Sequence, residues 1–167
     1  LVRRKHDVVV FFDDDFVPSR YWLDRVARVF SSRPDLAGLT GLVLADGAKG
    51  PGIALDDARA LVEAADGDAT RSGGALDERF GPYGCNMAFR TAAIEGLSFD
   101  ERLPLYAWLE DFDFGGQIRR RGGRTARVEA LWGVHLGNKT GRERGLRLGY
   151  SQIANAAYLS GKGNVPA

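Results

Sequence analysis

The segment Asp7-Val-Val-Val-Phe-Phe-Asp-Asp-Asp-Phe-Val-Pro18 decides the class of fold. Its first half, Asp7–Phe12, is a short apolar run of β-branched and aromatic residues, which is typical of a buried strand in a parallel sheet. This strand runs directly into three consecutive aspartates, Asp13–Asp15. We therefore predict a central parallel strand with a carboxylate cluster at its carboxyl end, where open α/β sheets bind their ligands.

The rest of the chain alternates expected helices and strands. We expect helices from Ser19, as the N-cap, to Ser32, at Asp56–Ala65, at Glu110–Arg121 and at Gly141–Leu159, with a helical turn at Thr91–Glu95. We expect further strands at Gly38–Ala45, Asn86–Phe89 and Arg124–Ala130. This order predicts an α/β fold, with a mixed sheet flanked by helices. The last helix carries one apolar stripe, formed by Leu146, Tyr150, Ile153 and Ala157.

Length and composition limit the classes of protein. A chain of 167 residues suits one domain, 1–167, and 44% apolar with 27% charged residues excludes general disorder. The formal net charge of +1 gives no broad cationic surface, so we do not expect a nucleic-acid partner. A single cysteine excludes an internal disulfide framework and a multi-cysteine zinc site. We find no apolar run long enough to span a membrane as a helix.

The three aspartates form the first candidate site. Adjacent carboxylates repel one another and raise one another's pKa unless a cation lies among them. Mg²⁺ and Mn²⁺ prefer such oxygen ligands and leave positions for phosphates. The alternative is a solvated acidic turn that leads into a helix, where negative charge suits the N-terminus.

A second acidic group lies in Trp108-Leu-Glu-Asp-Phe-Asp-Phe114. At helical spacing Asp111 shares a face with Phe114 and Ile118, so its carboxylate is directed toward the packed side of the helix. A carboxylate beside an apolar wall can serve as a general base. The alternative is that these acidic residues only favour the first turn of a helix.

His135, in Trp132-Gly-Val-His-Leu-Gly137, is the third candidate. A neutral imidazole can complete the coordination of a metal or contact a diphosphate. The alternative is a structural histidine beside aromatic residues, which is the interpretation we give to His6.

Four segments together resemble a family 2 glycosyltransferase with the GT-A fold, and the resemblance covers nearly the whole chain. They are Phe11–Pro18, Gly84–Arg90, Phe99–Glu101 and Leu109–Phe114. The resemblance implies a metal-dependent inverting glycosyltransferase, which uses Mn²⁺ or Mg²⁺ and a nucleotide-diphosphate sugar as donor. The acceptor would be a hydroxyl of a carbohydrate or a lipid-linked molecule, in polysaccharide or glycolipid assembly. A cytoplasmic location, at the inner face of the membrane for a lipid-linked acceptor, would follow.

The resemblance also assigns the donor side of the site. Asp13 and Asp15 match the DxD pair. Asp15 would be a direct metal ligand, and Asp13 would also bind the metal but lie nearer the ribose of the nucleotide than Asp15 does. Asp14 would contact either the metal or the nucleotide, and His135 would be a third metal ligand.

On the acceptor side, Asp111 matches the base that deprotonates the acceptor hydroxyl, and Glu110 would orient the acceptor. One segment would lie under the donor sugar and the acceptor, namely Gly84, Cys85, Asn86 and Met87. From the residues alone, Cys85 is either a nucleophile or a buried, inert thiol, and we favour the thiol because no histidine is near it in sequence.

Two departures from the family pattern matter. Only Leu1–His6 precede the aspartate strand, whereas the family has a nucleotide-binding unit there. We therefore expect an incomplete GT-A-like domain, truncated at its N-terminal half. The processive motif Gln-x-x-Arg-Trp is missing, because Gln117-Ile-Arg-Arg120 is followed by Arg121. A non-processive enzyme is the prediction.

Alternatives to this function stay open. One is a Mg²⁺-dependent nucleotidyltransferase, and another is a non-catalytic carbohydrate-binding remnant. The basic stretch Lys139–Arg147 has three interpretations: contact with a diphosphate, peripheral contact with an anionic membrane, or a solvated helix face.

Overall fold

The computed structural model of the protein describes residues 6–72, 74–79, 81–105, 107–138 and 145–164. The strands are β1 (Val8–Phe12), β2 (Phe16–Pro18), β3 (Leu36–Asp46), β4 (Leu76–Asp77), β5 (Asn86–Arg90) and β6 (Arg124–His135). The α-helices are α1 (Trp22–Ser32), α2 (Leu55–Gly67), α3 (Thr91–Ile94), α4 (Glu110–Arg120) and α5 (Leu146–Lys162). Two short 3₁₀ helices are η1 (Gly47–Lys49) and η2 (Ala69–Ser72).

All the described strands belong to one mixed sheet. Its order is β1-β5-β3-β6-β2, with β4 paired to β6. β3 and β6 run parallel, and the other pairs are antiparallel. This confirms the expected α/β class with a mixed sheet.

The first strand forms as predicted, but the expectation that it is central, parallel and buried was wrong. Among the described residues β1 lies at the edge of the sheet and pairs only with β5, antiparallel, with Val8 opposite Arg90. Its residues Val8–Phe11 are half-buried rather than central. An apolar β-branched run fits any strand with both faces covered, and it carries no information on the direction of its neighbour.

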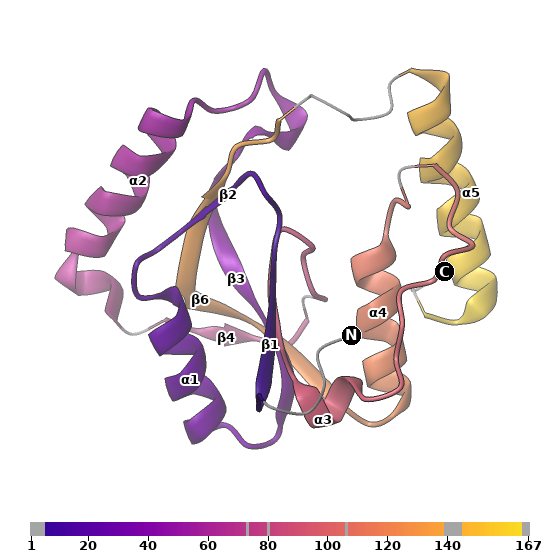
Figure 1. The fold of residues 1–167 in the computed structure, drawn as a ribbon, viewed down its shortest axis with the longest axis horizontal. Helices are drawn as coiled ribbons and strands as arrows, with labels where there is room; N and C mark the ends of the chain where they lie inside the picture. Colours follow the sequence, from indigo (N-terminus) through magenta and orange to yellow (C-terminus); the bar gives the residue numbers. More distant parts are fainter. Residues whose placement is uncertain (1–5, 73, 80, 106, 139–144, 165–167) are drawn as a thin grey trace.

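Helices cover both faces of the sheet (Figure 1). On one face α1 packs Trp22, Val26 and Phe30 against the strands, and α2 packs Ala58 and Val62 nearby. On the opposite face the core is formed by α4 with β3 and β5, and it contains Ala37, Met87, Phe89, Phe114 and Ile118. Neighbouring strand residues, such as Leu36 and Ala37, point to opposite cores, as the period of two requires.

Helix α1 begins later than the sequence predicts. Tyr21 occupies the N-cap position, and no side chain caps the helix. The Ser19 hydroxyl lies two residues earlier and donates to Asp66 Oδ1 at 2.5 Å. Ser19 instead accepts from the Tyr21 amide and ties α1 to the end of α2. The long-range bond to Asp66 explains the difference from the local N-cap pattern.

Helix α5 lies outside α4, at the edge of the molecule (Figure 1). Its buried residues are Ser151, Asn155 and Leu159. The apolar stripe expected on this helix exists, but Leu146, Tyr150 and Ile153 face outward. No helix among the described residues is both long and apolar enough to cross a membrane.

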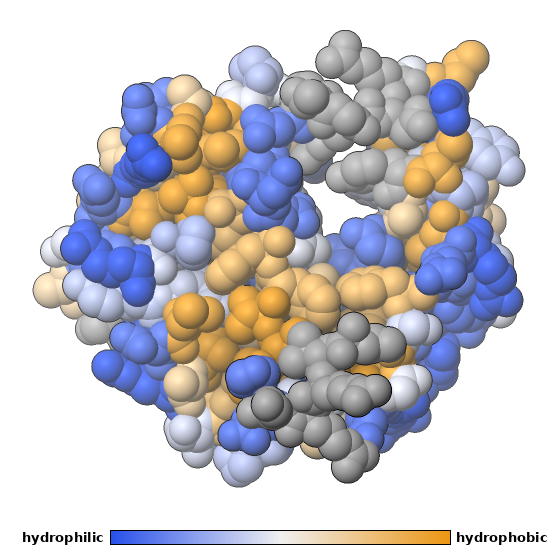
Figure 2. Space-filling view, in the orientation of Figure 1, coloured by the Kyte–Doolittle hydropathy of each residue, from blue (hydrophilic) through white to orange (hydrophobic). Residues whose placement is uncertain are grey.

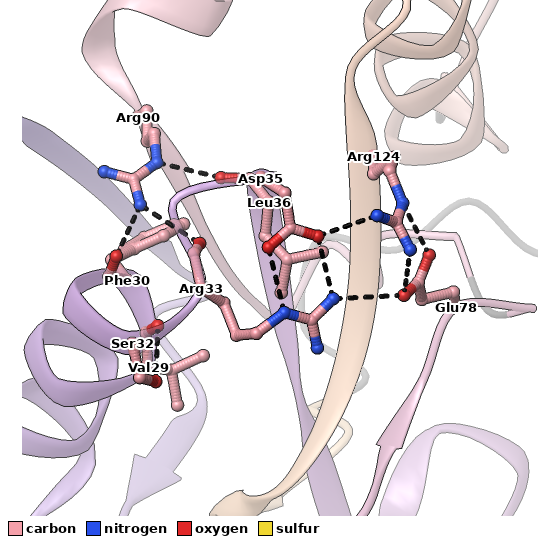
Figure 3. Close-up of polar contacts among 9 residues, drawn as sticks. All are labelled: Val29, Phe30, Ser32, Arg33, Asp35, Leu36, Glu78, Arg90 and Arg124. Carbon is pink, nitrogen blue, oxygen red and sulfur yellow. Dashed lines mark hydrogen bonds and ion pairs between the residues drawn. The ribbon is translucent and has the colours of Figure 1, made fainter.

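Four charged side chains close the end of the sheet where β3 and β6 begin (Figure 3). Arg124 donates to Asp35 at 2.7 Å and to Glu78 at 2.6 Å, and Arg33 donates to the same two carboxylates. The bond from Arg33 lowers the pKa of Asp35 to about 2. This network fixes the starts of the parallel pair, and the candidate site lies at the other end.

Candidate metal and catalytic site

The first group of polar residues lies at the ends of four strands. Asp13 follows β1, and a tight turn, closed by the Phe16 amide on the Asp13 carbonyl at 3.1 Å, brings Asp15 to the start of β2. Phe16 lies opposite His135, the last residue of β6. Asp46 ends β3 and is paired in register with the same histidine. Residues far apart in sequence therefore meet where parallel strands end.

Asp13, Asp15 and His135 form a group that could hold a metal ion, with one ligand atom of each within 4.8 Å of the others. His135 Nε2 lies 3.2 Å from Asp15 Oδ1 and 3.9 Å from Asp13 Oδ2. The side chains of Asp15 and His135 are only 6% and 4% exposed, whereas that of Asp13 is 49% exposed. The group thus has a buried floor and one side open to solvent.

The imidazole of His135 is oriented by its other nitrogen. Nδ1 lies 2.9 Å from Asp46 Oδ1, and the Tyr83 hydroxyl donates to Asp46 Oδ2 at 2.6 Å. Because Asp46 as a carboxylate only accepts, Nδ1 donates in this contact, and Nε2 is the nitrogen that faces Asp13 and Asp15. Nε2 is buried and finds no hydrogen-bond partner in the described part of the chain.

This donor set fits a divalent cation. A lone pair directed at two carboxylates is unfavourable without a positive charge between them, and a histidine oriented by a carboxylate is a usual metal ligand. Asp15 is also fixed in place, because its Oδ2 accepts from the Asn138 amide at 2.6 Å. The three residues expected to bind a metal are therefore brought together, while Asp14 is exposed beside them.

The second group begins α4. Three non-glycine residues before or at its start have positive φ: Leu105 at 57°, Ala107 at 51° and Leu109 at 73°. Such conformations cost of order 1–3 kcal/mol each and concentrate at functional sites. The Asn155 side chain of α5 helps to hold this loop, because its Nδ2 donates to the Trp108 carbonyl at 3.0 Å.

Glu110 and Asp111 differ in how they are held. Asp111 is buried, and its two carboxylate oxygens accept from the Gly84 amide at 2.8 Å and the Phe112 amide at 2.7 Å. Burial raises the pKa of Asp111 although these bonds oppose the shift. Burial, with the charges of Asp111 and Asp13, raises the pKa of Glu110 to about 7. Both carboxyls are thus more basic than usual, as a proton acceptor near neutral pH should be.

The segment after Tyr83 joins the two groups. The Gly84 amide reaches Asp111, and the Cys85 carbonyl accepts from the Asp13 amide at 3.3 Å. The side chains of Cys85, Asn86 and Met87 are buried, and the Asn86 side chain bonds the Gly41 amide. These three side chains therefore pack inside the protein, whereas Gly84 lies at the partly exposed start of the segment.

Cys85 has the environment of a structural thiol. It is 1% exposed, and burial raises its pKa to about 12. A thiol with so high a pKa is a poor nucleophile at neutral pH.

Sequence reasoning missed Asp46 and Tyr83, which position the histidine. Asp46 could have been found as a carboxylate at the end of a predicted strand, but Tyr83 carries no local signal. It also missed Lys162, whose ammonium bonds Asp100 at 2.7 Å and Asp113 at 2.9 Å and fastens the end of α5 to α4. Of the basic stretch, residues 139–144 lie outside the described residues, and Arg147 is exposed.

Neither a comparison with protein-family models nor a search of curated proteins finds a match for this chain.

Proposed function

We propose that this chain is the catalytic and acceptor-side part of a metal-dependent inverting glycosyltransferase with a GT-A-like fold. The donor would be a nucleotide-diphosphate sugar, and the acceptor a hydroxyl of a carbohydrate or of a lipid-linked molecule. The observation that carries the proposal is the buried Nε2 of His135, which faces Asp13 and Asp15 and has no hydrogen-bond partner among the described residues. A ligand set of two carboxylates and one imidazole at strand ends suits a cation that also binds phosphates.

In this proposal Asp13, Asp15 and His135 would hold Mn²⁺ or Mg²⁺. The cation, when bound, neutralises charge on a diphosphate leaving group. The family resemblance of Phe11–Pro18 and Leu109–Phe114 supports the same assignment.

Asp111 would act as the general base. The acceptor oxygen would form a bond to the anomeric carbon while the bond from that carbon to the diphosphate oxygen breaks, and its electrons leave with the nucleoside diphosphate. The acceptor proton would pass to Asp111, whose position is fixed by the Gly84 and Phe112 amides. Attack from the face opposite the leaving group gives inversion. Glu110 would orient the acceptor.

A raised carboxyl pKa favours this chemistry over nucleotidyl transfer. A sugar phosphate attacking a nucleoside triphosphate is already ionised and needs no base, whereas a neutral hydroxyl does. The two reactions also differ in product, because nucleotidyl transfer releases pyrophosphate and glycosyl transfer releases a nucleoside diphosphate.

The test is thermal unfolding of the chain with UDP, GDP, dTDP or CDP, each with and without Mn²⁺. The proposal predicts that one nucleotide with Mn²⁺ raises the melting temperature, because a ligand that binds only the folded state stabilises it. Asp15→Asn should remove this increase, and Asp24→Asn, a change at an exposed residue of α1, should not.

An increase in melting temperature that persists in Asp15→Asn would place the metal elsewhere. Binding of carbohydrate without any effect of metal or nucleotide would favour the non-catalytic remnant. Release of pyrophosphate from a nucleoside triphosphate and a sugar phosphate would favour the nucleotidyltransferase.

A further inference from the structure

The outer face of α5 carries large apolar side chains in solvent. Leu146 is 93% exposed, Tyr150 61% and Ile153 76%. Their spacing of four and three residues places them on one side of the helix, and Ala157 continues the line. Single exposed apolar residues are ordinary on protein surfaces, but an aligned stripe on one helix marks a surface that contacts something apolar.

Polar contacts on the inner face fix the helix in this orientation. Ser151 and Asn155 are fully buried, and Asn155 bonds the carbonyl of Trp108. At the C-terminal end Lys162 bonds Asp100 and Asp113. Rotation of α5 to bury the stripe would break these contacts and expose Leu159, so the outward direction of the stripe follows from the packing.

The charge of α5 differs from that of the other long helices. Helices α1, α2 and α4 all contain acidic residues, whereas Leu146–Lys162 contains none. Arg147 lies beside the stripe and is exposed. In the sequence just before α5, Lys139, Arg142 and Arg144 outnumber the single acidic residue Glu143. An uncharged stripe on a helix with no acidic residue, with the exposed Arg147 beside it, is complementary to a surface that is apolar inside and anionic outside.

We propose that α5 is a membrane-docking helix, which lies along an anionic lipid bilayer with Leu146, Tyr150 and Ile153 inserted at the interface. A tyrosine suits this position because its ring is apolar and its hydroxyl is polar. Figure 2 shows orange, apolar surface over α5 at the upper right, at the outer edge of the molecule.

A second copy of the chain is a poorer occupant of this stripe. From Leu146 to Ala157 the stripe spans eleven helical steps, or roughly 17 Å, on one helix. A stable protein interface needs about 800 Å² and about 20–30 residues on each partner. The exposed apolar residues of α1 and α2, such as Leu23 and Leu61, do not extend the stripe, because those helices cover the other face of the sheet (Figure 1).

The test is flotation of the protein with lipid vesicles. One set contains phosphatidylcholine alone, and the other contains phosphatidylcholine mixed with phosphatidylglycerol. The proposal predicts binding to the anionic set that weakens as salt rises, since the basic residues contribute by charge. A triple variant should lower the partition coefficient of the protein between vesicles and water by about tenfold or more. It combines Leu146→Gln, Tyr150→Gln and Ile153→Gln. Glutamine keeps a good helix propensity at these positions.

The matched control replaces Leu23, Leu55 and Leu61 by glutamine, which removes an equal number of exposed apolar residues from α1 and α2. This variant should float like the unchanged chain. Circular dichroism checks that both variants are folded, and Ile153→Gln alone, with a smaller expected loss, serves if the triple variant unfolds.

Three results would overturn the proposal. They are no flotation with anionic vesicles, equal flotation of the stripe variant and the unchanged chain, and a stripe-dependent dimer in sedimentation without vesicle binding. None of these measurements needs a sugar donor, so their outcome is independent of the proposed transferase activity.

Discussion

His135 Nδ1 lies 2.9 Å from Oδ1 of Asp46, and this contact decides which nitrogen of the ring faces the carboxylates of Asp13 and Asp15. Asp46 is in turn held by the Tyr83 hydroxyl and by the Ala48 amide. These two donors lower the pKa of Asp46 although burial opposes them. Asp46 therefore stays ionised and keeps the proton of the neutral ring on Nδ1.

Asp46→Asn should weaken metal binding although every proposed ligand is retained. An amide in place of the carboxylate can donate to Nδ1 and favour the wrong tautomer, and loss of such a contact costs about 10- to 100-fold in metal affinity. Titration of Mn²⁺ followed by calorimetry measures the change. Glu63→Asn, at an exposed residue of α2, should leave the affinity unchanged. Equal affinity in Asp46→Asn and the unchanged chain would show that Asp46 does not position the histidine.

Asp111→Asn and Glu110→Gln should separate the roles of the first two acidic residues of α4. Asp111→Asn is expected to keep donor binding and to lose transfer by about 10²- to 10⁴-fold, since it removes the proposed base. Glu110→Gln should raise KM for the acceptor more than it lowers kcat. Initial rates of nucleoside diphosphate release provide both constants. Full activity of Asp111→Asn would show that another group is the base.

Stability should depend on pH through Glu110. Its pKa is about 7 in the folded chain, against an ordinary value of 4.5, so the folded state holds this proton more tightly than the unfolded state. Its stabilising effect is complete below about pH 4.5 and is lost as pH rises through 7. With metal removed by a chelator, the unfolding free energy of the unchanged chain relative to Glu110→Gln should fall by on the order of 1–3 kcal/mol between pH 5 and pH 8.

Urea denaturation at a series of pH values measures this difference. Because the comparison is with Glu110→Gln, the titration of other groups such as Asp35 cancels. Parallel curves for the two proteins would mean that Glu110 is not buried among carboxylates in solution.

Local patterns were enough to predict most of the elements. The strands at Asn86 and Gly38, the helix at Glu110 and the inward direction of Phe114 and Ile118 follow from periodicity and are confirmed. Two features depend on contacts between distant segments and were not predicted correctly. One is the edge position of β1, and the other is the bond of Ser19 to Asp66 that replaces the expected N-cap.

Local patterns likewise predicted only some residues of the candidate site. Asp13 and Asp15 were found because they follow an apolar run that predicts a strand. His135 was found after the strand expected at Arg124–Ala130, which in the structure continues to His135 itself. Asp46 and Lys162 were missed, because both act on residues that are distant in sequence. Asp46 contacts a residue 89 positions away, and Lys162 contacts residues 62 and 49 positions away. The stripe on α5 was visible in the sequence, but its direction is set by buried polar groups that periodicity alone does not reveal.

Lys162→Met should destabilise the chain more than the loss of an ordinary surface ion pair. The side chain of Lys162 is 22% exposed and bonds Asp113, which is fully buried, so the change leaves a buried carboxylate with fewer partners. A cost of about 1–3 kcal/mol is expected. Arg79→Met removes the pair with Asp77 at an 87% exposed side chain and should cost much less, because solvent screens an exposed ion pair. Urea denaturation compares the two, and equal costs would show that Lys162 does not fasten α5 to α4.

Two glycines in helices test how closely the chain after α5 approaches α4. A Cβ on Gly116 of α4 would clash with the carbonyl oxygen of Asn164, a backbone atom, whereas a Cβ on Gly149 of α5 would meet nothing within 4 Å. Gly149→Ala should therefore stabilise the chain by about 0.5–1 kcal/mol, the helix-propensity difference between the two residues. Gly116→Ala brings the same propensity gain, but it must push Asn164 away from α4. Because Asn164 bonds the buried Asp113, we expect a net loss of about 1–3 kcal/mol. If both alanine variants were stabilised equally in urea denaturation, Asn164 would not lie against Gly116, and the contact that closes α5 onto α4 would have to be made elsewhere.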